Sequence, residues 1–465
     1  MKNHHIEFNE VDYIVPSELY NIEYSYLSKQ GFPFTKDFLL RTLYISPLSK
    51  FELASFFGFN QRELNVAIEE PISKSEVSYL EDGRLCLTAL AKSYFSDLEA
   101  KPMVEKPQTR TSNVTFDLIC FNKVTNQHGG WNTGLRLDVN HEVQSMSEQH
   151  ARSMFAKNFQ RFVEAGDLGN IRTHDNSLPS LYSVDAVKRK RTIAHRIKRT
   201  FEIDFDNKIK PFYINKTYEN DEEISHAISK DTDTLRLGNN TETIKQAWDT
   251  FEDMSVARFI KADEIDFRGM IAEMADTSGN KPYELLIGPL YGSQPWTKIE
   301  QFLKRLKPTK QQAKIKELSW VGANTRYWGI SESFNKAKES LQAYQKTGKG
   351  NNYQLAMYLP CDDQYKAKEK AIREWKQKLG NLSSCEGVLN GLFDGSVEVI
   401  LLENEFAAVS YHLSMPDLSP VHIPLGFFTK DKQLVQRISN VVTSFLNGSV
   451  AHDKPNLIGS LNTNR

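Results

Sequence analysis

The chain has 465 residues, a length that corresponds to two to four domains of ordinary size. Hydrophobic residues make up 40% of it, enough for buried cores, and the 58 basic and 59 acidic residues leave a net charge of -1. This balance excludes a basic field over the whole molecule, so any nucleic-acid site must be a local patch. The widely spaced Cys86, Cys120, Cys361 and Cys385 argue against a zinc site or a disulfide framework and predict a cytoplasmic protein.

The beginning of the chain predicts neither export nor membrane insertion. The stretch MKNHHIEFNEVDY has no apolar core of the kind that signal peptides need. No segment approaches 18 uninterrupted apolar residues, so we expect no membrane helix. The first predicted helix runs from Glu18 to Gln30, with Leu19, Ile22 and Tyr26 on its apolar face and Gly31 at its end.

Residues 35–96 carry the signals of three successive helices. Apolar residues at helical spacing predict the first of them, and these residues are Phe38, Leu39, Leu40, Leu43 and Tyr44. Ser49 is a suitable N-cap for a second helix, which Gly58 ends. Asn60 caps a third helix, Gln61 to Glu69, which Pro71 is expected to stop.

A hairpin and a last helix complete this stretch. Glu76 to Leu80 alternates like a strand, Asp82-Gly83 is a strong hairpin signal, and Leu85 to Leu87 is the returning strand. Thr88 then caps a final short helix. This order of elements resembles the winged helix-turn-helix, the DNA-binding fold of many prokaryotic regulators. We therefore predict a winged-helix domain, with its N-terminal helix, over residues 1–100.

The resemblance implies which residues would contact DNA. In that family the third helix enters the major groove and the hairpin tip touches the backbone. By position, the groove candidates are Asn60, Gln61, Arg62 and Asn65, whose side chains can each form two hydrogen bonds, and the backbone candidate is Arg84. The third helix also carries Glu63, Glu69 and Glu70, which phosphates repel. The alternative is therefore a winged helix that docks a protein.

Residues 101–113 are predicted to form a linker, because they contain prolines and few apolar residues. A mixed α/β middle region is predicted over 114–275, beginning with a strand from Val114 to Phe121. Ser145 to Phe162 has the apolar spacing of a helix. His128, beside two glycines, is interpreted as part of a polar turn and less readily as a ligand contact.

The densest run of positive charge lies between Val187 and Thr200. Its basic residues are Lys188, Arg189, Lys190, Arg191, Arg196, Lys198 and Arg199. Such a run in a nearly neutral protein is a candidate surface for phosphate. The other interpretation is an amphipathic helix with a charged outer face, and the two are compatible. Two strands, Phe201–Phe205 and Ile209–Ile214, are expected to follow.

Strands and helices alternate over residues 280–446. This alternation predicts a C-terminal α/β domain with a largely parallel sheet, and residues 447–465 are expected to form a loose tail. The closing segment, from Val397 to Thr429, weakly resembles the second lobe of phospholipase-D-like domains. That family's catalytic signature is His, one residue, Lys, four residues and Asp, and it does not occur in this chain. The resemblance therefore implies a domain that binds or scaffolds without catalysis.

Motifs for nucleotide hydrolysis, for zinc proteases and for serine hydrolases do not occur in the chain, so no catalytic residues are assigned. His412, Asp417 and His422 have the residue types of a metal site, but they are interpreted as loop residues. Four aromatic residues could stack on bases and are more readily assigned to the core: Trp296, Trp320, Tyr327 and Trp328.

The sequence thus predicts a multidomain α+β or α/β protein without cofactor, metal or membrane association. The leading hypothesis is a non-enzymatic DNA-binding subunit or regulator of a prokaryotic multi-protein system, such as defence against phage or plasmids. Its partners would be double-stranded DNA and other subunits. One alternative is a metal-dependent nuclease that uses Asp204, Asp206, Asp394 and Glu398. A second alternative is a protein-interaction scaffold in which the winged helix docks a partner.

Overall fold

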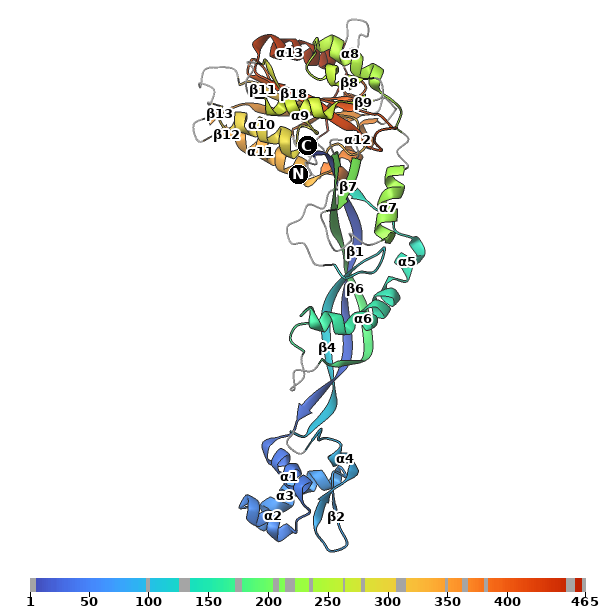
Figure 1. Cartoon of the computed structure of the whole chain (residues 1–465), viewed down its shortest axis with the longest axis vertical. Helices are drawn as coiled ribbons and strands as arrows, with labels where there is room; N and C mark the ends of the chain where they lie inside the picture. Colours follow the sequence, from blue (N-terminus) through green and yellow to red (C-terminus); the bar gives the residue numbers. More distant parts are fainter. Residues whose placement is uncertain are drawn as a thin grey trace. The chain divides into compact units, whose positions relative to one another are not determined.

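The structure is a computed structural model and confirms a multidomain α+β protein (Figure 1). It describes residues 6–97, 101–124, 134–171, 178–203, 209–213, 222–233, 237–261, 264–276, 281–306, 315–347, 350–361, 367–379, 384–448 and 456–461. The chain divides into two compact units. Unit 1 contains residues 1–16, 126–139 and 194–465, and unit 2 contains residues 17–125 and 140–193.

Unit 2 contains the stretch that resembles a winged helix, with its helices and hairpin in the predicted order. Its elements are α1 (Phe34–Ile45), α2 (Lys50–Phe57), α3 (Gln61–Ser73), β2 (Val77–Tyr79), β3 (Leu85–Leu87) and α4 (Ala89–Lys92). The sheet of the wing gains a bridge between Leu48 and Leu85. Side chains from all these elements form one core, which includes Leu40, Leu53 and Ile68. Pro71 was predicted to stop α3. It lies inside the helix, which continues to Ser73, so this prediction was wrong.

The segment before the winged helix is a strand and not the predicted helix. Strand β1 runs over Ile6–Gly31 and pairs antiparallel with β4 (Met103–Asp117), which occupies most of the predicted linker. Tyr20, Ile22 and Tyr24 are buried at alternate positions of β1, the period of a strand. The helical prediction was wrong because apolar residues at positions 19, 22 and 26 also fit a helical face.

Helix α6 covers the strands of unit 2. It spans Ser147–Glu164, close to the predicted Ser145–Phe162, and follows the short α5 (His141–Ser145). Figure 1 shows α6 beside β4 and β6, and β6 (Ser180–Ile203) neighbours β1 in the sheet. The ring of Tyr24 lies 5.0 Å from that of Phe155, centroid to centroid, and Phe116 lies 6.2 Å from Phe162. These aromatic contacts make the core of the sheet.

The basic run is part of strand β6, so its interpretation as an amphipathic helix was wrong. Residues 180–193 of this strand belong to unit 2 and residues 194–203 to unit 1. The end of β6 pairs antiparallel with β7 (Ile209–Tyr213). The two predicted regions are therefore strands where the structure describes them, but the first is the end of the long β6 and not a separate strand. In unit 1, β1 also pairs with β5 (Leu135–Arg136).

Unit 1 is built on an eight-stranded sheet with the order β10-β18-β17-β16-β11-β14-β15-β19. Its strands are β10 (Tyr283–Ile287), β11 (Glu317–Val321), β14 (Gln354–Cys361), β15 (Cys385–Leu389), β16 (Val397–Leu402), β17 (Phe406–Leu413), β18 (Ile423–Thr429) and β19 (Leu457–Ser460). Strand β11 is parallel to β14, and β14 is parallel to β15, whereas the other neighbours in this order are antiparallel. The prediction of a largely parallel sheet was therefore wrong.

Helices cover both faces of this sheet, which is why every residue of β16, β17 and β18 is buried. One layer contains α10 (Ser293–Leu303), α11 (Glu332–Tyr344) and α12 (Ala367–Leu379). Helices α8 (Thr241–Phe251) and α13 (Lys432–Asn447) pack on each other and on β17 (Figure 1). The remaining elements are α7 (Glu222–Asp233), η2 (Ala257–Phe259), β8 (Ile260–Lys261), β9 (Glu264–Ile265), α9 (Phe267–Ala275), β12 (Lys346–Thr347) and β13 (Gly350–Asn351).

Two further predictions concern this unit. The segment predicted as a loose tail contains strand β19, which pairs antiparallel with β15 at the edge of the sheet. Trp320, Tyr327 and Trp328 are almost completely buried, which confirms that these rings belong to the core. Trp296 packs against the same core and is only partly buried.

Candidate nucleic-acid interface

The candidate groove residues lie in the first half of α3. Asn60 and Glu63 form a capping box, in which the Asn60 side chain accepts from the Glu63 N–H at 2.9 Å and Glu63 accepts from the Asn60 N–H at 2.9 Å. Such a box satisfies N–H groups that have no partner within the helix. Leu64 is buried in the core, so the side chains before and after it project outwards.

Gln61, Arg62 and Asn65 are all exposed, whereas the carboxamide oxygen of Asn60 is engaged in the cap. The structure thus brings three polar side chains together on the outer side of α3. Their hydrogen-bonding groups are of the kind that read base edges in the major groove. Asn60 is better described as a residue that orients the helix.

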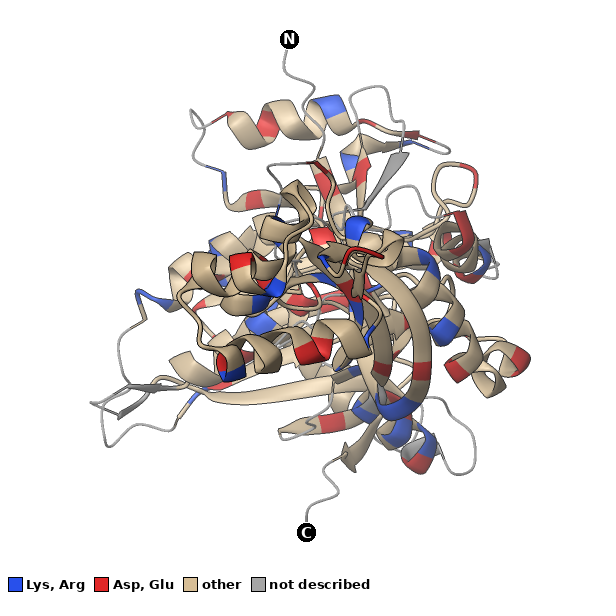
Figure 2. Ribbon diagram, turned by 90° about the horizontal axis from the view of Figure 1, so that it is seen from below, with Lys and Arg blue, Asp and Glu red and all other residues tan. Residues whose placement is uncertain are grey.

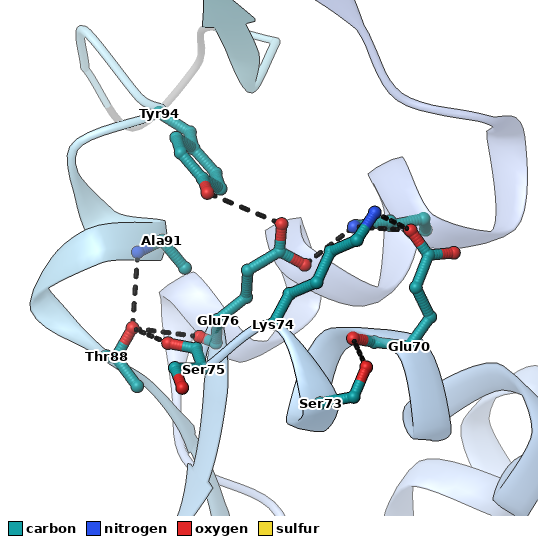
Figure 3. Close-up of polar contacts among 9 residues, drawn as sticks. Glu70, Ser73, Lys74, Ser75, Glu76, Thr88, Ala91 and Tyr94 are labelled. Carbon is teal, nitrogen blue, oxygen red and sulfur yellow. Dashed lines mark hydrogen bonds and ion pairs between the residues drawn. The ribbon is translucent and has the colours of Figure 1, made fainter.

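Two of the three glutamates of α3, Glu63 and Glu70, have partners within the same domain. Glu63 belongs to the capping box, and Glu70 accepts from Lys74 at 2.6 Å and from Lys36 at 3.3 Å (Figure 3). The ammonium groups of Lys74 and Lys36 lower the pKa of Glu70, with Lys74 contributing most. Part of the negative charge that opposes phosphate is therefore compensated internally, and Glu69 is left as an exposed acid.

A buried ion pair lies behind these residues. The ammonium group of Lys36, in α1, is 2.6 Å from Glu76, and both side chains are almost fully buried. Figure 3 shows the Tyr94 hydroxyl directed at the same Glu76 carboxylate, and the distance between them is 3.4 Å. Thr88 Oγ1 donates to the Ser75 carbonyl and accepts from the Ala91 N–H. The network joins α1, the end of α3, the wing and α4, so it holds α3 relative to the wing.

The wing is a tight hairpin whose arginine is already paired. The Leu80 N–H donates to the Arg84 carbonyl at 2.8 Å, and Gly83 has φ 80°, which favours glycine. The Arg84 guanidinium contacts the Asp82 carboxylate at 2.7 and 2.8 Å. Both side chains are about half exposed, so this pair is a weak one in water. A phosphate would have to compete with Asp82 for Arg84.

The winged helix has exposed apolar residues that the sequence pattern did not predict. Phe51 on α2 is 83% exposed, and Tyr79 is exposed on the wing, where Lys50 lies 5.4 Å above its ring. Phe34, Phe38 and Ile45 of α1 are also exposed, and Phe38 is one of the apolar residues whose spacing predicted this helix. The spacing of hydrophobic residues could not reveal this, because aromatic residues occur on both sides of the helices.

The first half of the basic run remains accessible. Lys188, Lys190 and Arg191 are exposed on β6. Arg189 is half exposed and lies 3.0 Å from the buried carboxylate of Glu18 on β1. The exposed cations of this strand in unit 2 are therefore a candidate surface for phosphate.

The second half of the run faces acids of its own unit. Arg196 lies 3.6 Å from Asp12 and 3.1 Å from Glu332, and Lys198 lies 2.5 Å from Glu10. Residue numbers fall along β1 as they rise along β6, so the two strands are antiparallel. Arg196 and Lys198 are thus engaged within the protein.

Arg199 is buried as well. It donates to Thr232 at 3.1 Å and lies over the ring of Phe201. The predicted seven-residue surface is therefore reduced to its first four residues. Figure 2 shows Lys and Arg interspersed with Asp and Glu along the ribbon, in agreement with a net charge near zero.

Two acids of β1 hold their protons unusually tightly. Burial raises the pKa of Asp12 to about 7, although Arg196 acts in the opposite direction. Burial also raises the pKa of Glu7 to about 7, and the neighbouring Glu10 adds to this shift. The Asp12 carboxylate accepts from the Glu332 N–H at 2.7 Å, at the start of α11. Both shifts place a change of charge near neutral pH.

Of the acids proposed for a nuclease, the structure describes Asp394 and Glu398, and these two lie in different environments. Glu398 is fully buried and accepts from the Leu290 N–H and from the Trp320 indole N–H, at 3.0 and 2.9 Å. Another neighbour is His412, at 3.3 Å. Asp394 is exposed, unlike Glu398. Asp204, Asp206 and His128 lie outside the described residues. Glu398 therefore accepts hydrogen bonds from buried donors in the interior of the sheet.

The described part of the chain contains no group of three metal-ligating side chains. His412 is buried and Asp417 is exposed, and burial lowers the pKa of His422 to about 4. Within the same residues, no helix has both the length and the apolar character needed to cross a bilayer.

Comparison with known proteins adds little to this picture. No family model matches the chain, and no curated protein matches it. Among solved structures, it is similar to TrmBL2, an archaeal chromatin protein described as showing a novel mode of DNA binding. That match has 11% identity and a TM-score of 0.20, and covers 51% of this chain and 72% of the other. Such a low score does not establish a common fold, and the resemblance to phospholipase-D-like domains also stays a prediction.

Proposed function

We propose that this protein is a non-enzymatic DNA-binding protein whose winged helix contacts the major groove through α3. The observation that carries the proposal is the outer side of α3, where Gln61, Arg62 and Asn65 are exposed together on a helix fixed by a capping box. Arg84 at the tip of the wing supplies a backbone contact in the same domain. The role in a prokaryotic defence system stays a hypothesis from the sequence.

The exposed cations of β6 form a second contact with the same ligand. Arg189 lies beside Glu18 on β1, and β1 ends at Gly31, directly before the winged helix. The strand from Glu18 to Gly31 corresponds to about 40 Å at roughly 3.3 Å per residue. A duplex must therefore extend about 12 base pairs to reach both contacts, at about 3.4 Å per base pair.

We expect two kinds of variant to weaken DNA binding in different ways. Arg62→Ala should cost roughly 1–3 kcal/mol of binding free energy on duplexes of any length. The triple change of Lys188, Lys190 and Arg191 to alanine should reduce the logarithmic salt slope by about 0.9 for each phosphate that is no longer neutralised. The triple variant should bind a duplex of about 30 base pairs more weakly than wild type does. Its affinity for a duplex of about 8 base pairs should hardly change, because such a duplex cannot reach from the winged helix to the cations of β6.

Fluorescence anisotropy of the full chain with labelled duplexes over a salt series measures both effects. Lys245, an exposed lysine of α8 in unit 1, is the matched control, and Lys245→Ala should leave the salt slope unchanged. Absence of binding at low salt, or binding that none of these variants alters, would contradict the proposal.

The second candidate is a winged helix that docks a protein, and one observation favours it. Acidic residues slightly outnumber basic ones over residues 35–96, and apolar side chains such as Phe51, Phe56 and Val66 are exposed there. Exposed apolar patches are typical of protein–protein contacts. A salt-independent partner together with no DNA affinity would establish this alternative.

A further inference from the structure

Helix α1 has an apolar stripe on its outer side that the described residues of its own domain leave uncovered. Phe34 is 77% exposed, Phe38 41% and Ile45 76%. On a helix, the offsets of four and eleven residues place these three side chains on one face. The rings of Phe34 and Phe38 lie 4.6 Å apart, so the stripe is preformed.

The opposite face of α1 is fully occupied. Leu39, Leu40 and Leu43 are buried in the core of the winged helix. A helix at the surface of a monomer normally has one apolar stripe, which faces its core. Helix α1 has a second one, which spans its length, about 17 Å at 1.5 Å per residue. An exposed stripe of this kind indicates a contact with another molecule.

The order of residues along the stripe favours a second copy of the same helix. Asp37 and Arg41 lie between the apolar ends and form an ion pair at 2.8 Å, and Arg41 is also over the ring of Phe38. When two copies of α1 pack antiparallel about a two-fold axis, Phe34 of one copy meets Ile45 of the other. The same arrangement places Asp37 opposite Arg41 twice, because the pairs 34/45 and 37/41 have nearly the same midpoint. The pattern is thus complementary to itself in shape and in charge.

We propose that two copies of this chain associate through antiparallel packing of their α1 helices. Phe34, Phe38 and Ile45 form the apolar contact, and each Asp37 lies between two arginines. The surface is small, so the dimer is a weak one, observed at micromolar concentrations. This inference goes beyond DNA binding and does not depend on it, since α3 and the wing take no part in the contact.

Sedimentation equilibrium of the chain tests the proposal. It measures the molar mass at protein concentrations between about 1 and 200 µM, a range suited to a small interface. Wild type should change from monomer to dimer over this range. The double variant Phe34→Ser/Ile45→Ser should raise the dissociation constant about thirtyfold or more, which corresponds to about 2 kcal/mol of binding free energy. Phe51→Ser removes a similarly exposed ring on α2 and should leave the dissociation constant unchanged.

Charge-reversal variants at Asp37 and Arg41 test whether the two α1 helices pack antiparallel. Arg41→Asp alone places like charges opposite each other, and so does Asp37→Arg alone, so each variant should be monomeric. An equimolar mixture of these two variants pairs acids with bases at both contacts and should form a heterodimer. Hydrogen exchange of α1 checks that each variant is folded.

Three results would overturn the proposal: a wild type that is monomeric at every concentration, a dimer that survives Phe34→Ser/Ile45→Ser, or a mixture that stays monomeric. Loss of DNA binding with an intact dimer would instead contradict only the DNA proposal. Dimerisation without DNA binding would leave the winged helix as a self-association module.

Discussion

Replacing Lys36 with methionine is expected to destabilise the winged helix by roughly 3–5 kcal/mol, because Glu76 would remain buried without its cation. Lys36 and Glu76 are both almost fully buried and lie 2.6 Å apart. Methionine fills a similar volume but offers no charge and no hydrogen-bond donor. Hydrogen exchange of the α3 amides in the full chain measures the effect, and it should become at least about a hundredfold faster.

Lys74 provides a matched control within the same network. Its pair with Glu70 is short, at 2.6 Å, but both side chains are more than half exposed. Lys74→Met should therefore cost less than about 1 kcal/mol. The double variant Lys36→Met/Glu76→Gln should recover much of the loss, because no buried charge is then left unpaired. Equal effects of Lys36→Met and Lys74→Met would contradict the importance of burial here.

Replacing Asp12 with asparagine is expected to make unit 1 more stable than wild type at pH 8 and no more stable near pH 4. Burial raises the pKa of Asp12 from 3.8 to about 7 in the folded protein. Between these values the folded state holds a proton that the unfolded state has released. The stability that this proton contributes is complete below pH 4 and is lost as the pH rises through 7.

The difference between the two pKa values corresponds to at most about 4 kcal/mol in the free energy of unfolding. The asparagine side chain has no proton to release, so the variant should show a flatter dependence of stability on pH between 4 and 7. Urea unfolding followed by tryptophan fluorescence reports on unit 1, because all the tryptophans of the chain lie in that unit. Asp249, an exposed acid of α8, is the control position. A variant less stable than wild type at pH 8 would show that Arg196 stabilises the Asp12 carboxylate more than burial destabilises it.

The winged helix was predictable from the sequence because its signals are local. Ser49 and Asn60 cap their helices as predicted, Gly58 has the left-handed conformation, and Gly83 lies in the turn of the wing. Most strands and helices of the C-terminal sheet were predictable too, since buried strands are continuous apolar runs. The direction of the strands was not, because it depends on which distant segments become neighbours.

The candidate interface was predictable only in part. The resemblance to winged-helix regulators implied Asn60, Gln61, Arg62 and Asn65 as groove residues, and the burial of Leu64 and Ile68 is consistent with the exposed positions of the last three. For the basic run, the sequence determined the charge but not its accessibility. Lys188 and its neighbours stay exposed, whereas Arg196 and Lys198 meet Asp12 and Glu10 from a strand near the beginning of the chain.

Only the tertiary structure decided these pairings and the long strands that make them. The apolar positions of β1 fit either a helix or a strand when they are considered alone, and the pairing with β4 and β6 determines which forms. Hydrogen bonds of a helix lie within the segment, whereas those of a strand require a partner that the local sequence does not contain. For the same reason, the exposed Phe34, Phe38 and Ile45 could be recognised only after the core had taken the other side of α1.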